Sequence, residues 1–202
     1  RLERFVQEII DRKSPRLMIF LPPRAGKSEI GSKMLPSWFL GRFPNLETII
    51  SSYSGDLASG FSRAVRNIFS SEKFKPLFAT SRLSPDSKAA DKWATTRGGG
   101  MNAVGVSGSL SGKGGSLLIC DDPHKDRNEA ESETSRQTVK DWYSSTFYTR
   151  RAPGAGILLF QTRWHEDVMS GWLLTERQEQ ERLWREEGVS EYYANSDVVY
   201  FT

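Results

Sequence analysis

The sequence predicts an α/β protein with a mostly parallel central β-sheet flanked by helices. Strand-like apolar segments alternate with amphipathic helical segments, one apolar segment ends in a Gly-Lys-Ser turn, and another ends in two adjacent aspartates. Alternating strands and helices form parallel sheets, because each helix carries the chain back across the sheet. With 202 residues, of which 37% are apolar, the chain can build one compact core, and we expect a single domain over residues 1–190.

The N-terminal third predicts two helices and a strand between them. Residues 2–12 have the apolar spacing of a short amphipathic helix, and the apolar run at residues 17–21 predicts the first strand. Residues 28–40 predict the next helix, with Pro36 expected to kink it or end it early. The residues expected to pack its apolar face are Ile30, Met34, Leu35, Trp38 and Phe39.

The middle of the chain predicts a strand, a helix and a β-hairpin insertion. Residues 47–53 have a strand pattern, and residues 56–69 carry an apolar stripe at helical spacing. Further on, two short strand-like segments flank three glycines at residues 98–100, which predicts a hairpin with a glycine turn. For the glycine-rich segment at residues 107–115 we favour a functional loop over a solvated connector, because it holds Lys113 just before the aspartate-bearing strand.

The C-terminal third continues the alternation. Residues 126–148 read as mostly helical, and two glycines at residues 154–156 are expected to separate them from an apolar strand at residues 157–164. Residues 168–187 predict a further helix. Residues 191–202 are expected to be a linker or the start of a connection to an absent C-terminal domain, with a strand at residues 198–201 as the alternative.

The strongest chemical signal is a phosphate loop at residues 21–28, directly after the first apolar strand. Its Gly-Lys-Ser end directs successive backbone N–H groups, the Lys27 ammonium and the Ser28 hydroxyl toward one small volume, which suits a nucleoside triphosphate with magnesium. Leu21 replaces the first glycine of the usual pattern, so the match is degenerate. Taken alone, the segment could also be an ordinary turn.

A second apolar segment, residues 116–120, ends in Asp121 and Asp122. In phosphate-loop ATPases the first acid after such a strand holds magnesium, and an acid after it can polarise the attacking water. Asp121 takes the first of these roles and Asp122 the second. An acidic turn after a strand is common, but the pair together with the phosphate loop predicts magnesium-dependent nucleotide hydrolysis.

Composition limits the other function classes. No apolar stretch reaches the roughly 20 residues that span a bilayer, and residues 1–4 do not resemble a signal peptide, so we expect a soluble, non-secreted protein without a membrane partner. The single cysteine, Cys120, rules out a disulfide framework or a cysteine-based zinc site. The net charge of +3 permits a polyanionic partner without requiring one. Because the chain begins at Arg1, we expect it to be a piece of a longer protein.

Five motifs follow one another in the order found in a known family. They are Pro-Pro-Arg-Ala-Gly-Lys-Ser, Trp-x-Thr-x-x-Gly-Gly, Gly-x-x-x-Gly-Lys-Gly-Gly, Leu-Ile-Cys-Asp-Asp-Pro-His-Lys and Gln-Thr-Arg-Trp-His-Glu-Asp. This ordered set, over roughly residues 15 to 175, resembles the ATPase domain of tailed-phage large terminases. The resemblance implies an ASCE-type P-loop NTPase fold that hydrolyses ATP with Mg²⁺ to translocate double-stranded DNA into a procapsid. It also implies that the family's nuclease domain is not present here, so this fragment should not cut DNA.

The resemblance also assigns roles to individual residues. The catalytic set would be Asp122, which positions water although many relatives carry glutamate there, with Lys27 and Arg24 on the phosphates and Lys113 reaching a neighbouring subunit's nucleotide. A plain surface arginine is the alternative for Arg24. The metal set would be Ser28 and Asp121. The nucleotide-binding set would be Pro23, Arg24, Ala25, Gly26, Lys27, Ser28, Glu29, Gln161, Thr162 and Arg163.

The implied partners are double-stranded DNA bound through its phosphates, a portal protein and a small terminase subunit. The chain would form a homo-oligomeric ring during packaging, with a monomer as the alternative in isolation, in the host cell cytoplasm and not in the mature virion. Two other functions stay open: a helicase-like nucleic-acid motor, and a nucleotide-gated assembly module with little catalysis. Phe5 and Gln7 are candidate adenine contacts, and core packing explains Phe5 equally well.

Overall fold

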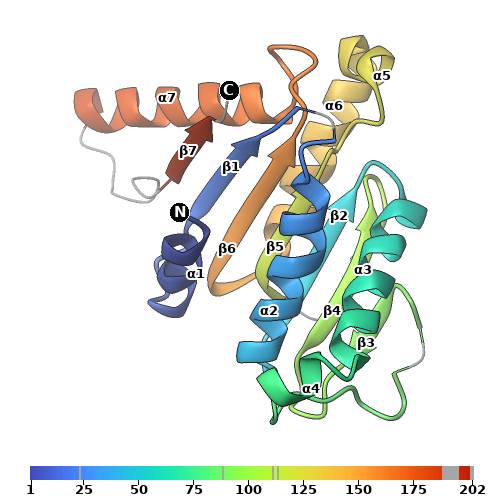
Figure 1. Cartoon of the computed structure of the whole chain (residues 1–202). Helices are drawn as coiled ribbons and strands as arrows, with labels where there is room; N and C mark the ends of the chain where they lie inside the picture. The colour runs from blue at the N-terminus through green and yellow to red at the C-terminus, as the bar shows by residue number, and fades with distance from the viewer. Residues whose placement is uncertain (23, 88, 111, 113, 188–195, 201–202) are drawn as a thin grey trace.

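The computed structural model describes residues 1–202 apart from residues 23, 88, 111, 113, 188–195 and 201–202. Its centre is a seven-stranded sheet in the order β3-β4-β2-β5-β6-β1-β7 (Figure 1). β3 is antiparallel to β4, and the other neighbouring pairs are parallel. The strands are β1 Arg16–Phe20, β2 Glu47–Ser52, β3 Lys92–Ala94, β4 Gly100–Gly105, β5 Gly115–Asp121, β6 Arg151–Gln161 and β7 Ser196–Tyr200.

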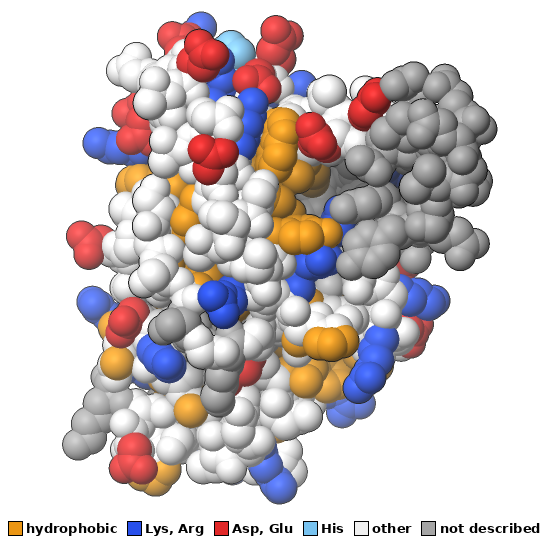
Figure 2. All heavy atoms as spheres, turned by 180° about the vertical axis from the view of Figure 1, so that it is seen from behind, with side chains coloured by type: hydrophobic (Ala, Val, Ile, Leu, Met, Phe, Trp, Pro, Cys, Tyr) orange, Lys and Arg blue, Asp and Glu red, His pale blue; other side chains and the backbone are white. Residues whose placement is uncertain are grey.

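Helices cover both faces of this sheet. One face carries α1 Leu2–Ile10, the π-helical turn η1 Glu29–Met34 with α2 Leu35–Arg42, α3 Gly55–Ser70 and α4 Phe74–Leu77. The other side carries α5 Arg127–Glu131, α6 Glu133–Trp142, the short turns η2 Tyr143–Phe147 and η3 Tyr148–Arg150, and α7 Met169–Glu187. Figure 2 shows the molecule from behind, where Lys and Arg side chains lie among Asp and Glu and hydrophobic side chains form a central band.

Two hydrophobic cores follow from the alternation of side chains along the strands. In β5, Leu117 and Ile119 pack toward α1–α4, whereas Leu118 and Cys120 pack toward α6 and α7. All four side chains are fully buried, which is why β5 reads as a continuous apolar run in the sequence. The α/β class, the mostly parallel sheet and the flanking helices are confirmed.

The predicted β-hairpin is confirmed as β3 and β4, and its second arm belongs to the main sheet. β4 pairs with β2 from Glu47↔Gly100 to Ser52↔Gly105. At the opposite edge, β7 pairs with β1 from Arg16↔Ser196 to Phe20↔Tyr200. Residues 196–200, which the sequence analysis placed in a linker with a strand as the alternative, are therefore a strand, and the sheet continues past residue 190.

The start of β6 differs from the prediction. We expected glycines 154 and 156 to separate a helix from a strand beginning at residue 157, but the strand begins at Arg151 and runs through both glycines. Gly154 adopts a φ of +84°, and the register of β5 against β6 shifts between Gly115 and Leu117. Gly156 lies so close to α1 that a Cβ atom there would be 2.5 Å from Ile9 Cδ1. Gly154 bends the strand, Gly156 allows α1 to pack closely on it, and neither glycine ends the strand.

The helix after the phosphate loop buries a different face from the one predicted. Leu35 and Phe39 are buried as expected, but Ile30, Met34 and Trp38 are 51%, 49% and 42% exposed. The buried side is completed by the small residues Gly31 and Ser32, which an apolar-stripe argument overlooks. The helix does not end early at Pro36: this residue lies in the first turn of α2, where proline is tolerated, just after the π-helical turn η1 gives way to the α-helix.

Gly31 is where this helix approaches the sheet most closely. A Cβ atom on Gly31 would lie 1.9 Å from Cε2 of the Phe160 ring, which is 1% exposed and has no room to move aside. We therefore expect Gly31→Ala to lower the free energy of unfolding by about 1–3 kcal/mol, as overpacking of a dense core does. Urea unfolding followed by circular dichroism measures the difference.

Gly60 is the matched control for this substitution. It lies in the interior of α3, and a Cβ atom there would meet nothing within 4 Å. Gly60→Ala should raise the free energy of unfolding by about 0.5–1 kcal/mol, because alanine favours the helix. If Gly31→Ala stabilised the protein as much as Gly60→Ala does, the close packing of η1 on β6 would be wrong.

Candidate active site

Three strand ends meet at one edge of the sheet. β6 lies between β1 and β5 and is parallel to both, with Phe20 opposite Gln161 and Asp121 opposite Phe160. The carboxyl ends of these strands therefore point to the same rim (Figure 1). The phosphate loop leaves β1 there, Asp121 ends β5 with Asp122 directly after it, and Gln161 ends β6. Ligands of open α/β sheets bind at this kind of rim.

The phosphate loop turns sharply before η1. Arg24 and Gly26 both adopt left-handed backbone conformations, with φ of 64° and 78°. A side chain on Gly26 would have open space around it, so the glycine is required for its backbone angle and not for close packing. The carbonyl of Gly26 accepts the first helical hydrogen bond from the Ile30 N–H at 3.0 Å. Arg24, Ala25 and Gly26 are exposed along the loop, whereas Pro23 lies outside the described residues.

Lys27 lies between the two aspartates. Its Nζ is 3.3 Å from Asp121 Oδ1 and contacts Asp122 Oδ2 directly. Lys27 is 7% exposed and Asp121 is 1% exposed, so the ammonium and the Asp121 carboxylate are largely shielded from water. The predicted meeting of the phosphate loop with the aspartate pair is therefore observed. A buried lysine needs such partners, because an unpaired buried charge is strongly unfavourable.

Asp122 is held by the backbone on several sides. Its Oδ1 accepts a 2.8 Å hydrogen bond from the Thr162 N–H, and its own N–H donates to the Phe160 carbonyl at 2.9 Å. Its carbonyl accepts from the Tyr53 N–H at 3.0 Å. Asp122 adopts a φ of 44°, which turns the chain out of β5. These bonds fix the side chain at the rim, where 31% of it is exposed.

Ser32 is a site residue that the sequence analysis missed. Its hydroxyl donates a 2.6 Å hydrogen bond to Asp121 Oδ2, and the serine is fully buried. The family resemblance instead pairs Asp121 with Ser28 as metal ligands, and Ser28 is the half-buried N-cap residue of η1. The signal available in the sequence was a small polar residue on the sheet-facing side of the helix that follows the loop.

The remaining predicted residues surround this centre. Gln161 is 1% exposed, and neither its amide nitrogen nor its amide oxygen has a hydrogen-bond partner in the described part of the chain. Arg163 is exposed just beyond it. The exposed Glu29 pairs with Lys33 at 2.6 Å on the outer side of η1. Lys113, expected to act on a neighbouring subunit, lies outside the described residues.

Comparison with known families decides the relationship. Residues 18–197 match the family described as terminase large subunit, T4likevirus-type, N-terminal. The chain belongs to this family. Among curated proteins, no sequence matches it significantly.

Solved structures of large terminases share the fold. The HK97 bacteriophage large terminase is 11% identical with a TM-score of 0.55, over 89% of this chain and 36% of its own. The large terminase of a thermophilic bacteriophage, solved in complex with ADP, is also 11% identical, with a TM-score of 0.51, over all of this chain and 44% of its own. The chain thus spans less than half the length of these two terminases. At this identity the likeness supports the P-loop ATPase fold of the ASCE class and no more.

The two candidate adenine contacts, Phe5 and Gln7, lie in different environments. Phe5 is 4% exposed in the core, and its ring lies 2.8 Å from the position of a Cβ atom on Gly156. Phe5 therefore serves core packing, the alternative that the sequence left open. Gln7 lies on the exposed side of α1 and donates to Asp11 Oδ1 at 2.9 Å.

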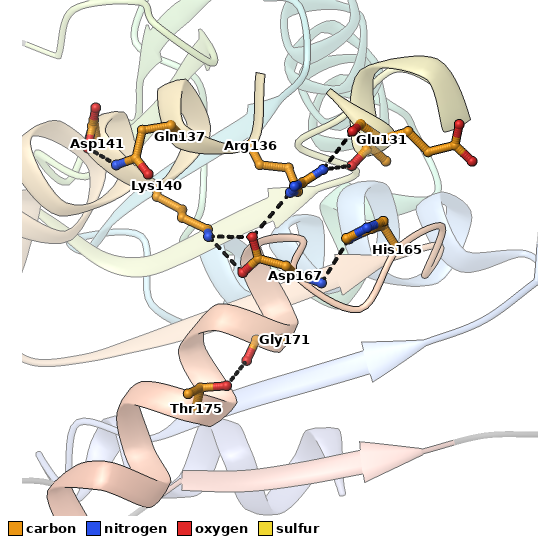
Figure 3. A network of polar contacts seen from close by, with 10 residues as sticks. Glu131, Arg136, Gln137, Lys140, Asp141, His165, Asp167, Gly171 and Thr175 are labelled. Atoms are coloured by element: carbon orange, nitrogen blue, oxygen red, sulfur yellow. Dashed lines mark hydrogen bonds and ion pairs between the residues drawn. The ribbon is translucent and has the colours of Figure 1, made fainter. Parts of the chain in front are cut away.

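The segment that follows β6 is fastened to α6. Asp167 accepts from Arg136 Nε at 3.2 Å and from Lys140 Nζ at 2.7 Å, and Arg136 also donates to the Glu131 carbonyl at 2.8 Å (Figure 3). The Asp167 N–H donates to His165 Nδ1 at 3.0 Å. The lysine and arginine hydrogen bonds hold the pKa of Asp167 below its ordinary value.

In the described part of the chain, no helix is long and apolar enough to cross a membrane.

His124 follows the aspartate pair and is 2% exposed. Neither ring nitrogen has a hydrogen-bond partner among the described residues. Burial lowers the pKa of His124 below its ordinary value of 6.5, with Glu129 opposing this change and Arg136 adding to it. The imidazole is therefore neutral near pH 7, and protonating it inside the fold is unfavourable.

This burial predicts a pH dependence of stability. Because the unfolded state binds a proton at His124 more readily than the folded state, the free energy of unfolding should fall as the pH drops below about 6.5. His124→Leu should reduce this fall in the free energy of unfolding, since leucine carries no titrating group. Urea unfolding at pH 7.5 and 5.5 measures both proteins. An equal loss in the two would show that other groups cause the pH dependence.

Proposed function

We propose that this chain is the ATPase motor domain of a viral DNA-packaging terminase, which hydrolyses ATP with Mg²⁺ to translocate double-stranded DNA into a procapsid. The observation that carries the proposal is the buried Lys27 between Asp121 and Asp122, directly after the phosphate loop. The family match and the ADP bound to the thermophilic-phage terminase support nucleotide binding by this chain. Activity, substrate and partners of the whole terminase are part of the proposal.

The residues at the rim fit a magnesium–nucleotide complex. Asp121 Oδ1 is buried and accepts no hydrogen bond from the described residues, so it has capacity for a cation. Asp121 and Ser28 would hold Mg²⁺, which typically uses one or two carboxylates together with substrate phosphates. The metal would neutralise charge on the β- and γ-phosphate oxygens.

The protein's own groups would then carry the reaction. Lys27 would leave the carboxylates and contact the β- and γ-phosphates, while the loop N–H groups of Ala25, Gly26 and their neighbours cradle them. Asp122 would orient the attacking water and take up its proton in an in-line displacement of ADP from the γ-phosphorus. Gln161, Thr162 and Arg163 would sense whether the γ-phosphate is present, and the unpartnered Gln161 amide supports a polar ligand nearby.

Two basic residues would add charge from outside the loop core. Arg24 is exposed in a left-handed loop conformation, from which its guanidinium could reach the γ-phosphate. Lys113 would reach the nucleotide of a neighbouring subunit, so that the complete site would exist only in a homo-oligomeric ring. The isolated chain would then be a monomer with low turnover.

The proposed partners follow from the packaging role. DNA would be contacted through its phosphates without base specificity, so binding should weaken steeply with added salt. A portal protein and a small terminase subunit would complete the assembly in the host cell cytoplasm, and cleavage of DNA would require a nuclease domain outside this chain.

Two other functions remain candidates, and each has a discriminating observation. A helicase-like motor would separate strands, whereas a packaging motor moves along intact duplex. A nucleotide-gated assembly module would bind nucleotide with little turnover. The Asp122→Asn variant separates nucleotide binding from turnover.

The direct test is nucleotide binding followed by product analysis. Calorimetry with ADP and Mg²⁺ should show one site per chain, and chromatography after incubation with ATP should show ADP and phosphate, with turnover raised by duplex DNA or by added full-length protein. A chain that binds neither ADP nor ATP would contradict the proposal. Turnover accompanied by strand separation would favour the helicase-like motor.

A further inference from the structure

We propose that Ser32 is a positioning residue for Asp121, which holds the carboxylate in the orientation that binds the magnesium ion of the nucleotide. The inference rests on the proposed function and goes beyond it, because it assigns a role in metal affinity to a residue outside the phosphate loop. The juxtaposition that carries it is the 2.6 Å hydrogen bond from Ser32 Oγ to Asp121 Oδ2.

The two oxygens of Asp121 have different environments. Oδ2 accepts from Ser32, whereas Oδ1 lies 3.3 Å from Lys27 Nζ and accepts no hydrogen bond from the described residues. A carboxylate rotates readily about its terminal bond when nothing holds it, because that torsion has a broad preference. The Ser32 hydroxyl therefore fixes which oxygen faces the cation side.

Ser32 is itself rigidly placed. It is fully buried in the π-helical turn η1, and its neighbour Gly31 packs against the Phe160 ring with no room for a side chain. A π-helix closes its hydrogen bonds one residue later than an α-helix, and such turns are frequent at functional sites. This wider turn places Lys27 and Ser32 on the same side of the helix start, where both reach Asp121.

Groups that orient a metal ligand affect metal affinity although they do not touch the metal. Without the Ser32 hydroxyl, Asp121 Oδ2 would lose its buried donor, and the carboxylate could rotate out of the orientation that faces the cation. The affinity for Mg²⁺ would then fall, whereas contacts between the phosphate loop and the nucleotide would be unaffected. A purely structural serine would instead change the free energy of unfolding and leave the magnesium dependence as it is.

The experiment measures ADP binding by calorimetry as a function of Mg²⁺ concentration, and in EDTA, for the wild-type chain and Ser32→Ala. We expect the Mg²⁺ concentration that gives half of the metal-dependent gain in ADP affinity to rise about 10-fold or more, in line with other residues that support metal ligands. ADP affinity in EDTA should change less than about 2-fold, because the Ser32 hydroxyl is directed at Asp121 Oδ2 and Ser32 lies outside the phosphate loop.

Ser37→Ala is the matched control. Ser37 is a buried serine on the following helix, and its hydroxyl donates to the Lys33 carbonyl at 2.7 Å, away from Asp121. It should leave the magnesium dependence unchanged. Ser32→Cys nearly preserves the volume but has only a weak donor, so it replaces the alanine variant if that variant does not fold, with the same rise expected.

The outcomes are distinguishable. An unchanged magnesium dependence in folded Ser32→Ala or Ser32→Cys would overturn the positioning role while leaving the proposed function standing. An equal rise in Ser37→Ala would also overturn it, since the effect would then be general to the helix. A wild-type chain that binds no ADP at any Mg²⁺ concentration would overturn the proposed function and the positioning role together.

Discussion

Replacing Lys27 by methionine is expected to bring ATP turnover below detection. The substitution keeps the apolar stem of the side chain and removes the ammonium that we propose to act on the β- and γ-phosphates. Losing one preorganised charge of this kind typically lowers turnover by about 100- to 1,000-fold. Phosphate release in the presence of duplex DNA measures the effect, and ADP affinity should fall as well.

The buried setting of Lys27 adds a second consequence. Methionine would leave Asp121, which is 1% exposed, without its cationic partner, and an unpaired buried carboxylate is strongly unfavourable. Lys33→Met is the control, because Lys33 lies on η1, directly after the phosphate loop, and pairs with Glu29 at 2.6 Å on the outer side. Equal turnover in wild type and Lys27→Met would contradict the phosphate-loop assignment.

The second large effect is expected for Asp122→Asn. Asparagine can still accept the hydrogen bond from the Thr162 N–H, now 2.8 Å from Asp122 Oδ1, but it can neither take up a proton nor attract Lys27 as strongly. Turnover should fall by about 100- to 10,000-fold, as the loss of a general base does. Nucleotide affinity should stay equal or rise, because Lys27 is freed for the phosphates. Paired turnover and calorimetry measurements test both parts.

Asp141→Asn serves as the charge control for this variant, since Asp141 is exposed on α6 and accepts from Gln137 at 2.7 Å. Asp141→Asn should change neither turnover nor nucleotide affinity. Loss of turnover with retained binding in Asp122→Asn would exclude the assembly-module alternative. Undiminished turnover would remove Asp122 from the catalytic set.

The sequence was most informative where apolar runs end in polar groups. The runs before the phosphate loop and before Asp121 predict β1 and β5, and both are buried strands whose ends meet at the rim. That meeting was predictable because parallel strands present their carboxyl ends at one edge. The placement of β6 between them was not, since strand order depends on packing between distant segments.

Other parts of the site could not be predicted because small residues carry little signal. The small residues Gly31 and Ser32 form the sheet-facing side of η1. The large apolar residues Ile30, Met34 and Trp38 therefore lie on the exposed side. A prediction based on large apolar side chains at helical spacing therefore takes this exposed stripe for the buried face. Ser32 becomes visible as a site residue only when its hydroxyl is seen against Asp121. Gly154 likewise reads as a strand break, although the backbone bends there and the strand continues.

The segment between β6 and α7 is pinned at both ends. At one end the Thr162 N–H is bonded to Asp122, and at the other Asp167 is bonded to Arg136 and Lys140 of α6. Residues 162–167 therefore connect Asp122 to α6 through hydrogen bonds at both ends. A displacement of Asp122 that kept both sets of hydrogen bonds would have to move residues 162–167 and α6 together, which would connect the proposed nucleotide site to the helices on one face of the sheet.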